Sequence, residues 1–186
     1  VQNISKVDGE AGASTGAGSA PGSRSTYFSP SSVRWRKAAF ASANSGTSGA
    51  MAMYGEGVAI YLAPTADPRD SWQATLCHIA CEGRCFELGC NQFVTKAMYP
   101  KDLPGLDDLN NQPEIMCRGG SAIVATQGHV LAGPLYDQEG ILFADLDMAL
   151  VASGKFDFDV VGHYARPDVF QLIVNKKPAL PVVNKE

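Results

Sequence analysis

The sequence lacks any hydrophobic run long enough to cross a membrane. A spanning helix needs about 20 consecutive apolar residues, whereas the longest strongly apolar run, GVAIYLAP at residues 57–64, has the length of a strand. Strong charge of either sign is also missing, because the formal net charge is only -4. These absences remove any reason to expect a membrane span, or electrostatic binding to nucleic acid or to an anionic membrane surface.

The chain also lacks two marks of a secreted domain built on disulfides. Its five cysteines are an odd number, and no secretory signal opens the sequence. Both observations favour a reducing compartment over an extracellular one. We therefore expect a cytoplasmic location.

Acidic residues are missing from Ala11 to Gly55, and the first 50 residues hold little that could form a core. Gly, Ala and Ser fill 27 of these 50 positions, so burial cannot offset the entropy of ordering the segment. We expect residues 1–50 to be a low-complexity, disordered N-terminal segment. Its Ser-rich, Arg-bearing composition also resembles an organelle transit peptide, which leaves an organelle open as the alternative location.

From residue 51 onward, proline- and glycine-rich turns separate segments of helical and strand character. We expect helices at 51–57, 70–84 and 148–156, and strands at 58–63, 85–93, 140–147 and 168–175, with two more strands inside 121–133. Residues 100–119 read as a polar loop, and residues 176–186 as a tail. Asp70 or Ser71 should cap the second helix, and Asp147 the third. This alternation predicts an α/β domain in layers over residues 51–175.

Four of the five cysteines fall in CHIACEGRCFELGC, residues 77–90. A structural zinc site needs four converging ligands, usually in short C-x₂₋₄-C pairs. Here Cys77 and Cys81 share one face of a predicted helix, whereas Cys85 and Cys90 point to opposite faces of a predicted strand. We therefore predict buried, reduced thiols and no metal ligands, since free cysteine packs as a small hydrophobe.

Several segments together resemble a known family. GEGVAIYLAPTAD at 55–67, SWQATLCHIACEGRCFELGCNQF at 71–93, GGSAIVATQGHVLAGPLYDQEGILFADLD at 119–147 and KFDFDVVGHYARPDVFQL at 155–172 occur in order with the expected gaps. They resemble the C-terminal half of nitrilases, within the carbon-nitrogen hydrolase superfamily. The segment GHYARPDV, residues 162–169, resembles sequences of the nitrilase and cyanide hydratase branch rather than those of the amidase branches.

The resemblance implies a fold and a chemistry. The fold is a four-layer α-β-β-α sandwich, of which this chain would form part. The chemistry uses a Glu-Lys-Cys triad, in which a thiolate attacks the nitrile carbon, a glutamate moves protons and a lysine stabilises charge on the substrate nitrogen. Water then releases acid and ammonia, and no metal or organic cofactor is needed.

The chain departs from the family pattern at the catalytic residues. The Cys-Trp-Glu motif that holds the nucleophile should lie just before the helix that ends in the segment 51–57, and neither it nor the upstream Lys and Glu has a match here. No catalytic residue is therefore carried over. The resemblance places the loop Pro64, Thr65, Ala66 and Asp67 at the border of the substrate pocket, or else this is a proline-marked turn. His163 would pack at the pocket edge or at a subunit contact.

Three functions stay open at this point. The first is a nitrilase-family hydrolase of C-N bonds that acts on a small nitrile only when the missing half completes it, so that the chain alone is inactive. The second is a non-catalytic interaction module that associates with itself or with full-length nitrilase subunits. The third is a truncated product without function. Nitrile preference should depend on residues around the nucleophile, so this sequence does not reveal it.

Overall fold

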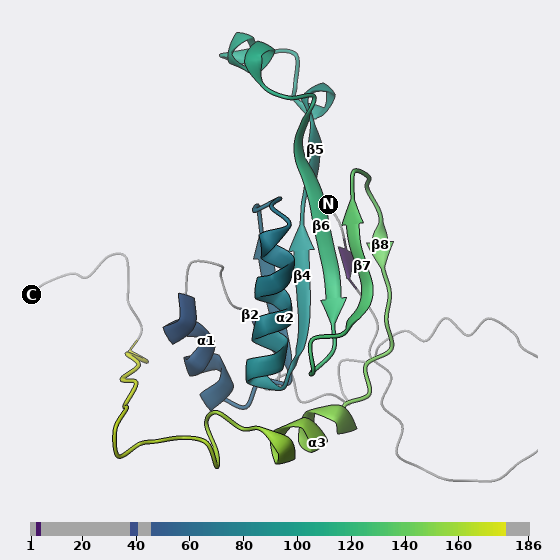
Figure 1. Cartoon of the computed structure of the whole chain (residues 1–186). Coiled ribbons are helices and arrows are strands. Elements are labelled where there is room, and N and C mark those ends of the chain that lie inside the picture. Colours follow the sequence, from purple (N-terminus) through teal and green to yellow (C-terminus); the bar gives the residue numbers. More distant parts are fainter. Residues whose placement is uncertain (1–2, 5–37, 41–45, 178–186) are drawn as a thin grey trace, which may run out of the picture.

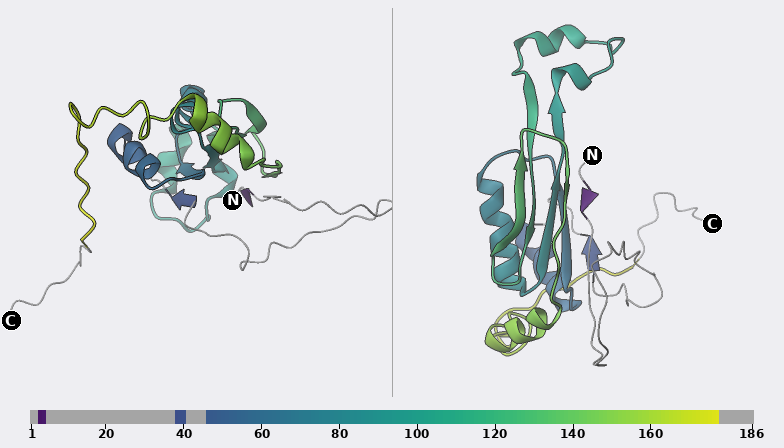
Figure 2. Two further views of the ribbon diagram at one scale, coloured as in Figure 1. Left: turned by 90° about the horizontal axis from the view of Figure 1, so that it is seen from below. Right: turned by 90° about the vertical axis from the view of Figure 1, so that its right-hand side faces the viewer.

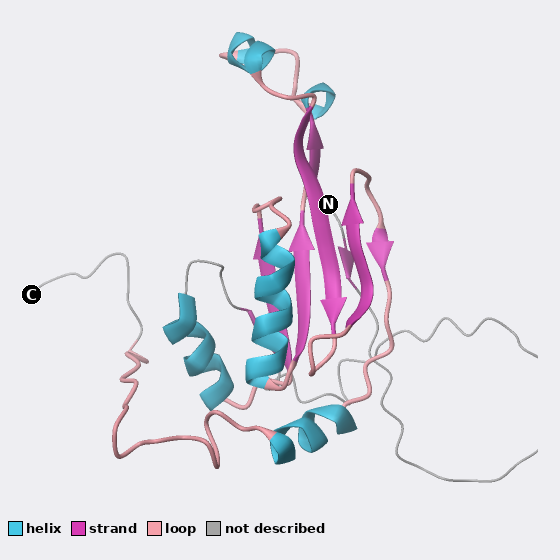
Figure 3. Cartoon of the chain, in the orientation of Figure 1, coloured by secondary structure: helices cyan, strands magenta, loops and turns pink. Residues whose placement is uncertain are grey.

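The computed structural model describes residues 3–4, 38–40 and 46–177, which form a mixed β-sheet flanked by helices (Figure 1 and Figure 3). The strands are β1 (Asn3–Ile4), β2 (Ala38–Phe40), β3 (Ile60–Thr65), β4 (Phe86–Asn91), β5 (Phe93–Thr95), β6 (Ile115–Val124), β7 (Val130–Tyr136) and β8 (Ile141–Leu142). The helices are α1 (Gly46–Gly55), α2 (Ser71–Gly83) and α3 (Ala149–Asp157), with two 3₁₀ helices, η3 (Lys96–Met98) and η4 (Leu106–Asn111).

The main sheet joins parallel and antiparallel strands. Its order is β2-β3-β4-β6-β5, with β7 also paired to β6. The first three strands are parallel, in the register Ala38↔Ile60 and Ile60↔Phe86, whereas β6 runs antiparallel to β4, β5 and β7. The β3-α2-β4 unit is therefore a crossover connection, and its helix packs on the sheet as such connections require.

Helices α1 and α2 cover one face of the sheet, and α3 lies across one end of it (Figure 2). The side chains buried between these two helices and the sheet are Ala50, Tyr54, Val58, Tyr61, Ala63, Leu76, Ala80, Cys85, Ala122 and Val124. This core explains why α2 forms where it does. Its apolar positions Leu76 and Ala80 are four residues apart, so they lie on one side and are both fully buried.

A smaller core lies on the opposite face of the sheet. Phe86, Ile123, Ala125 and Leu146 are buried together there. Leu146 belongs to the segment that leads from β8 to α3, so it fixes that segment beneath the strands. Asp147 then stabilises the start of α3, because its Oδ1 accepts a hydrogen bond from the Ala149 N–H at 2.9 Å, as the sequence predicts.

One hairpin projects away from this body. Strands β5 and β6 continue past the end of β4 and carry η3 and η4 at their tip (Figure 1). Leu103 and Ile115 are exposed on this arm, as is Met98. The polar, proline-broken composition of residues 100–119 is consistent with a segment that packs on little else. The predicted loop is nevertheless wrong beyond residue 114, since β6 begins at Ile115.

The sequence places most elements correctly. The helix predicted at 70–84 is α2 at 71–83, and the two strands predicted inside 121–133 are the ends of the β6-β7 hairpin. Asp70 occupies the N-cap position of α2, but its side chain makes no capping hydrogen bond. It instead approaches Arg118, so the predicted position of the cap is right but the capping hydrogen bond is absent.

Three other predictions are wrong in part or in whole. Residues 3–4, 38–40 and 46–50 lie in β1, β2 and α1, so the disorder predicted for residues 1–50 is wrong there; residues 1–2, 5–37 and 41–45 are outside the described part of the chain. The strand predicted at 140–147 is only β8, Ile141–Leu142, which pairs with β1. The strand predicted at 168–175 is absent: residues 168 and 169 lie in a turn, and residues 170–175 have no regular secondary structure and expose apolar side chains, because no strand of the described residues lies beside them to complete their hydrogen bonds.

Within the residues described, no helix has the length and apolar character needed to span a membrane. The longest of the three α-helices, α2, has 13 residues.

Candidate functional site

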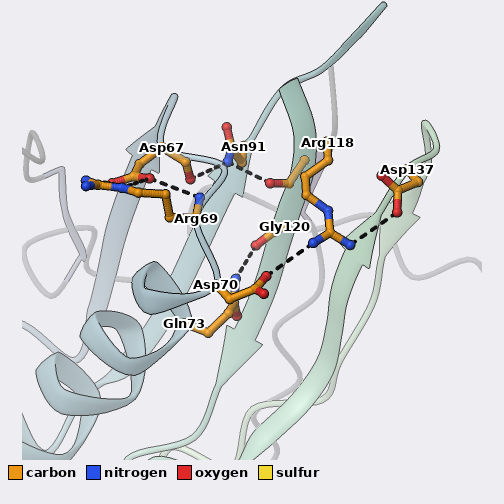
Figure 4. A network of polar contacts seen from close by, with 9 residues as sticks. Asp67, Arg69, Asp70, Gln73, Asn91, Arg118, Gly120 and Asp137 are labelled. Carbon is orange, nitrogen blue, oxygen red and sulfur yellow. Dashed lines mark hydrogen bonds and ion pairs between the residues drawn. The ribbon is translucent and has the colours of Figure 1, made fainter. Parts of the chain in front are cut away.

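The carboxyl ends of β3 and β4 meet at one edge of the sheet, beside the N-terminus of α2. Because β2, β3 and β4 are parallel, their carboxyl ends share this edge. In open α/β sheets, ligands bind in the crevice outside the carboxyl ends of the strands. Polar side chains from four segments gather here (Figure 4). We call this group the sheet-edge network, and it consists of Thr65, Asp67, Arg69, Asp70, Gln73, Asn91, Arg118, Ser121 and Asp137.

The loop after β3 is ordered by its own side chains. Thr65 Oγ1 accepts a hydrogen bond from the Asp67 N–H at 3.0 Å, and Asp67 Oδ1 accepts one from the Arg69 N–H at 3.0 Å. These are the short-range bonds that Thr and Asp make in turns. The Arg69 guanidinium also pairs with both Asp67 oxygens, with its Nε at 2.8 and 3.0 Å. Hydrogen bonds from Arg69 lower the pKa of Asp67 to about 2.

Asn91 connects this loop to the sheet. It is the last residue of β4 and is 2% exposed. Its Nδ2 donates to the main-chain oxygen of Asp67 at 2.8 Å and to that of Gly119 at 2.7 Å. One buried amide therefore holds the loop after β3 and strand β6 together.

Arg118 makes a second connection across the same edge. Its guanidinium lies 3.3 Å from Asp70 Oδ1, at the start of α2, and 3.2 Å from Asp137 Oδ2, after β7. It also stacks on the Tyr136 ring, with its central carbon 4.1 Å from the ring centroid. Close by, Gln73 Nε2 donates to the Gly120 oxygen at 2.7 Å. The strands and α2 are thus joined at this edge by side chains as well as by packing.

The site residues predicted from sequence fall at two separate places. Pro64 and Thr65 end β3, and Ala66 and Asp67 follow it, so all four lie at the sheet edge. His163 is exposed and stacks on Tyr164, at 4.8 Å between ring centroids. The structure therefore brings the four loop residues together and does not bring His163 to them.

His163 belongs to the opposite end of the sheet. Tyr164 packs on Phe158 at 4.9 Å between centroids, and Phe158 in turn lies under the Arg84 guanidinium at 5.3 Å. Arg84 comes just before β4, whereas Asn91 ends it. The contacts of His163 and the loop 64–67 therefore lie at opposite ends of β4. A strand rises by ~3.3 Å for each residue, so the whole strand separates them. The role of the loop as a pocket border stays a prediction.

The sheet-edge network can position groups but offers little reactivity of its own. Its hydroxyl from Ser121 is buried and hydrogen-bonded to the main chain of Asn91, which leaves it poorly placed for attack. Asp67 stays ionised down to strongly acidic pH because of Arg69, so it is a weak base at neutral pH. Within the described ranges, no group of three or more His, Cys, Asp or Glu side chains is arranged to hold a metal ion.

The burial predicted for Cys77, Cys81, Cys85 and Cys90 is right for Cys85 and wrong for the other three. Cys85 and Cys117 are buried, whereas Cys77, Cys81 and Cys90 are half-buried. All five are free. Burial, with a smaller contribution from nearby Glu87, raises the pKa of Cys85 to about 12, so this thiol is a poor nucleophile at neutral pH.

The comparisons with known proteins fit this architecture. Residues 47–156 match the model of the family described as carbon-nitrogen hydrolase. The chain belongs to the carbon-nitrogen hydrolase family. Over 135 residues it is 51% identical to an aliphatic nitrilase of Sinorhizobium fredii. The aligned residues cover 72% of this chain and 43% of that protein. It is 52% identical over 135 residues to a bifunctional nitrilase/nitrile hydratase of Nicotiana tabacum, covering 70% of this chain and 38% of that protein.

The solved structures support the same fold. A carbon-nitrogen hydrolase from Helicobacter pylori superposes with a TM-score of 0.55 at 15% identity, covering 72% of this chain and 47% of that one. The predicted fold class, an α/β domain of the nitrilase superfamily, is confirmed. The chain spans about two fifths of the length of the nitrilases that it matches.

Of the nine residues in the sheet-edge network, seven were not predicted from sequence as site residues, and Asn91 and Arg118 are the two among them that connect its segments. Asn91 follows a buried strand, and a polar residue at the carboxyl end of such a strand is the signal that could have identified it. Arg118 gave no such signal, because it lies in a segment predicted as a loop. The position of Arg118 at the sheet edge follows from the start of β6 at Ile115, which the sequence does not indicate.

Proposed function

We propose that this chain supplies the C-terminal half of a nitrilase that hydrolyses small nitriles to acid and ammonia. The observation that carries this proposal is an identity of about one half to nitrilases over 135 residues. The family triad of Glu, Lys and Cys comes from polypeptide outside residues 46–177. The described residues then act as the wall and support of the pocket, not as its reacting groups.

The sheet edge suits this role. In the pattern that the sequence resembles, the loop from Pro64 to Asp67 borders the substrate. The loop is held by Asn91 on one side and by its own turn bonds on the other. A wall of this kind contributes by fixing the substrate against the nucleophile, and positioning is a large part of enzymatic rate enhancement.

A complementation experiment tests the proposal. The chain is produced alone, and together with a polypeptide that supplies the N-terminal half of the Sinorhizobium fredii aliphatic nitrilase. Ammonia release is measured with aliphatic, aromatic and β-cyano nitriles. We expect turnover only from the combined halves, and none when the cysteine of the supplied Cys-Trp-Glu motif is replaced by alanine.

Two results contradict the proposal. The first is no turnover from two halves that are folded and associated. The second is turnover by the chain alone that is lost on Cys77→Ala or Cys81→Ala, because the nucleophile would then be one of its own thiols.

A non-catalytic association module is the second candidate, and one observation favours it. Residues 168–175 form no helix or strand and expose several apolar side chains, with Phe170 77% and Ile173 91% exposed. Exposed apolar patches mark interaction sites or cause aggregation. The partner in this case is a second copy of the chain or a full-length nitrilase subunit.

Light scattering during size-exclusion chromatography tests the association. We expect the chain to elute above monomer mass, and the double variant Phe170→Ser with Ile173→Ser to shift toward the monomer. The neighbouring exposed substitution Asn175→Ser is the matched control and should leave the mass unchanged. A monomer at every concentration of the unaltered chain, together with no co-elution with a full-length nitrilase, would exclude this second function.

A further inference from the structure

The pairing between β4 and β6 ends before the strands do. Their paired residues are Glu87↔Val124, Leu88↔Ile123 and Gly89↔Ala122. Beyond Gly89, β6 pairs with β5, in the register Phe93↔Arg118. We call the stretch between these two ladders, residues 90–92 and 119–121, the strand junction. Main-chain groups in a junction of this kind need other partners, because an unpaired buried group is costly.

Asn91 supplies those partners. Its N–H donates to Ser121 Oγ at 2.9 Å, and the same hydroxyl donates to the Asn91 oxygen at 3.2 Å. Its Nδ2 donates to the Gly119 oxygen at 2.7 Å. Its Oδ1 accepts from the Gln92 N–H at 2.9 Å and lies 3.7 Å from Cys117 Sγ. The side chain thus bridges the junction where the ladder is interrupted.

The same amide reaches beyond the junction. The second hydrogen of Nδ2 goes to the main-chain oxygen of Asp67, at 2.8 Å, in the loop after β3. Asparagine is suited to this place because its amide has two donors on one nitrogen and an acceptor beside them. An aspartate there would direct a carboxylate oxygen at two carbonyl oxygens, although its shape is the same.

We infer that Asn91 is a positioning residue that sets the loop 64–69 against strand β6 and so fixes the pocket wall. This inference rests on the proposed nitrilase function for the meaning of the wall, but the mechanical link can be tested without it. Asn91 lies behind the loop, fully packed, and acts on the substrate only through the main chain of Asp67.

The first measurement is amide hydrogen exchange on the full chain. The Asp67 and Arg69 N–H groups are both hydrogen-bonded within the loop, so their exchange reports its order. We expect Asn91→Asp to accelerate exchange at 65–69 by about tenfold and to leave 60–63 of β3 unchanged. Asn111→Asp, at an exposed position of η4, makes the same chemical change away from the junction and should have no effect.

The second measurement is kinetic, on the complemented enzyme. A variant that is merely less well folded lowers the amount of active enzyme and leaves KM as it was. A displaced pocket wall raises KM, and we expect an increase of about fivefold or more for Asn91→Asp, with kcat corrected for active sites also reduced. Asn111→Asp should match the unaltered enzyme in both constants.

Asn91→Ala removes both donors without adding charge. If Asn91→Asp does not fold, the loop exchange and the KM of Asn91→Ala test the inference instead. Unchanged loop exchange together with an unchanged KM in a folded variant would overturn the inference. If the complemented enzyme turns over no nitrile at all, the proposed function fails, and the exchange result alone decides the role of Asn91.

Discussion

Arg84 Nη2 donates a hydrogen bond to Asp157 Oδ2 at 2.9 Å, which joins the end of α2 to the end of α3 across 73 positions of the chain. The two side chains differ in burial, since that of Arg84 is 15% exposed and that of Asp157 is 69% exposed. The Arg84 stem also packs against Gly154, and its guanidinium lies over Phe158. Arg84 therefore holds α3 mainly by packing, with the ion pair as an addition.

This difference in burial predicts different costs for the two partners. Arg84→Ala should lower the free energy of unfolding by about 1–2 kcal/mol, because the buried stem is lost. Asp157→Asn should lower it by less than about 0.5 kcal/mol, because exposed ion pairs contribute little. Urea denaturation of the two variants measures both values. Equal losses would show that the charge pair, not the packing, holds α3.

A second prediction concerns the contact between α1 and α2. Gly83 ends α2 under the Tyr54 ring, and a Cβ added to Gly83 would lie 2.7 Å from Tyr54 Cδ1 and 3.0 Å from Cys85 Sγ. Gly83→Ala should therefore cost about 1–3 kcal/mol through overpacking. Gly55→Ala is the matched control, since nothing lies within 4 Å of a Cβ there.

Thermal unfolding of both glycine variants gives the comparison. We expect Gly55→Ala to be neutral or slightly stabilising, because alanine is the better helix former. In a Tyr54→Ala background, the cost of Gly83→Ala should shrink, since the clashing ring is gone. A cost that is the same with and without the ring would place its origin elsewhere.

Local sequence patterns could predict the elements that bury a periodic apolar face. Helix α2 was predicted within one residue because Leu76 and Ala80 mark its buried side. The β6-β7 hairpin was predicted because Gly128 marks a turn between two apolar runs, and it takes a φ of +82° there. These signals are carried by neighbours in the chain.

Features that depend on distant partners could not be predicted in this way. Residues 168–175 have strand composition, but a strand needs a neighbour, and none lies beside them in the described part of the chain. The sheet-edge network depends on Asn91 meeting Asp67 and Gly119, which are 24 and 28 positions away. The family resemblance located the loop Pro64–Asp67 from sequence alone. It did not indicate the hydrogen bonds that hold the loop in place.

A third prediction concerns the thiols. Cys85 and Cys117 are buried, so we expect a thiol reagent to modify them only on unfolding, whereas Cys77, Cys81 and Cys90 should react in the native protein. Mass spectrometry of the labelled peptides, before and after urea, separates the two groups. Metal analysis of protein purified without chelator should find well under one zinc per chain. Near one zinc per chain, lost together with secondary structure on chelation, would contradict the thiol assignment.

The fourth prediction concerns Glu87, the fully buried second residue of β4. Its two carboxyl oxygens have no hydrogen-bond partner among the described residues. Among the described residues, Glu87 interacts electrostatically with Tyr61 on β3, Cys77 on α2 and Cys85, and all three are acids that are neutral at pH 7. Burial without a compensating cation raises the pKa of Glu87 well above its ordinary value of 4.5.

The sign of the pH dependence follows from this shift. The folded chain holds the Glu87 proton more tightly than the unfolded chain, so the stabilisation is fully present below pH 4.5 and declines as the pH rises toward the folded-state pKa. The decline for one proton is at most ~1.4 kcal/mol for each pH unit. Glu87→Gln cannot ionise, so its advantage over the unaltered chain should grow as the pH rises above 4.5 toward the folded-state pKa. Glu139→Gln, at an exposed position, is the control and should give a curve parallel to that of the unaltered chain. Urea denaturation at each pH gives the free energy of unfolding for the three proteins. Parallel curves for Glu87→Gln and the unaltered chain would contradict the prediction. They would mean that the Glu87 carboxyl has water or another partner in solution.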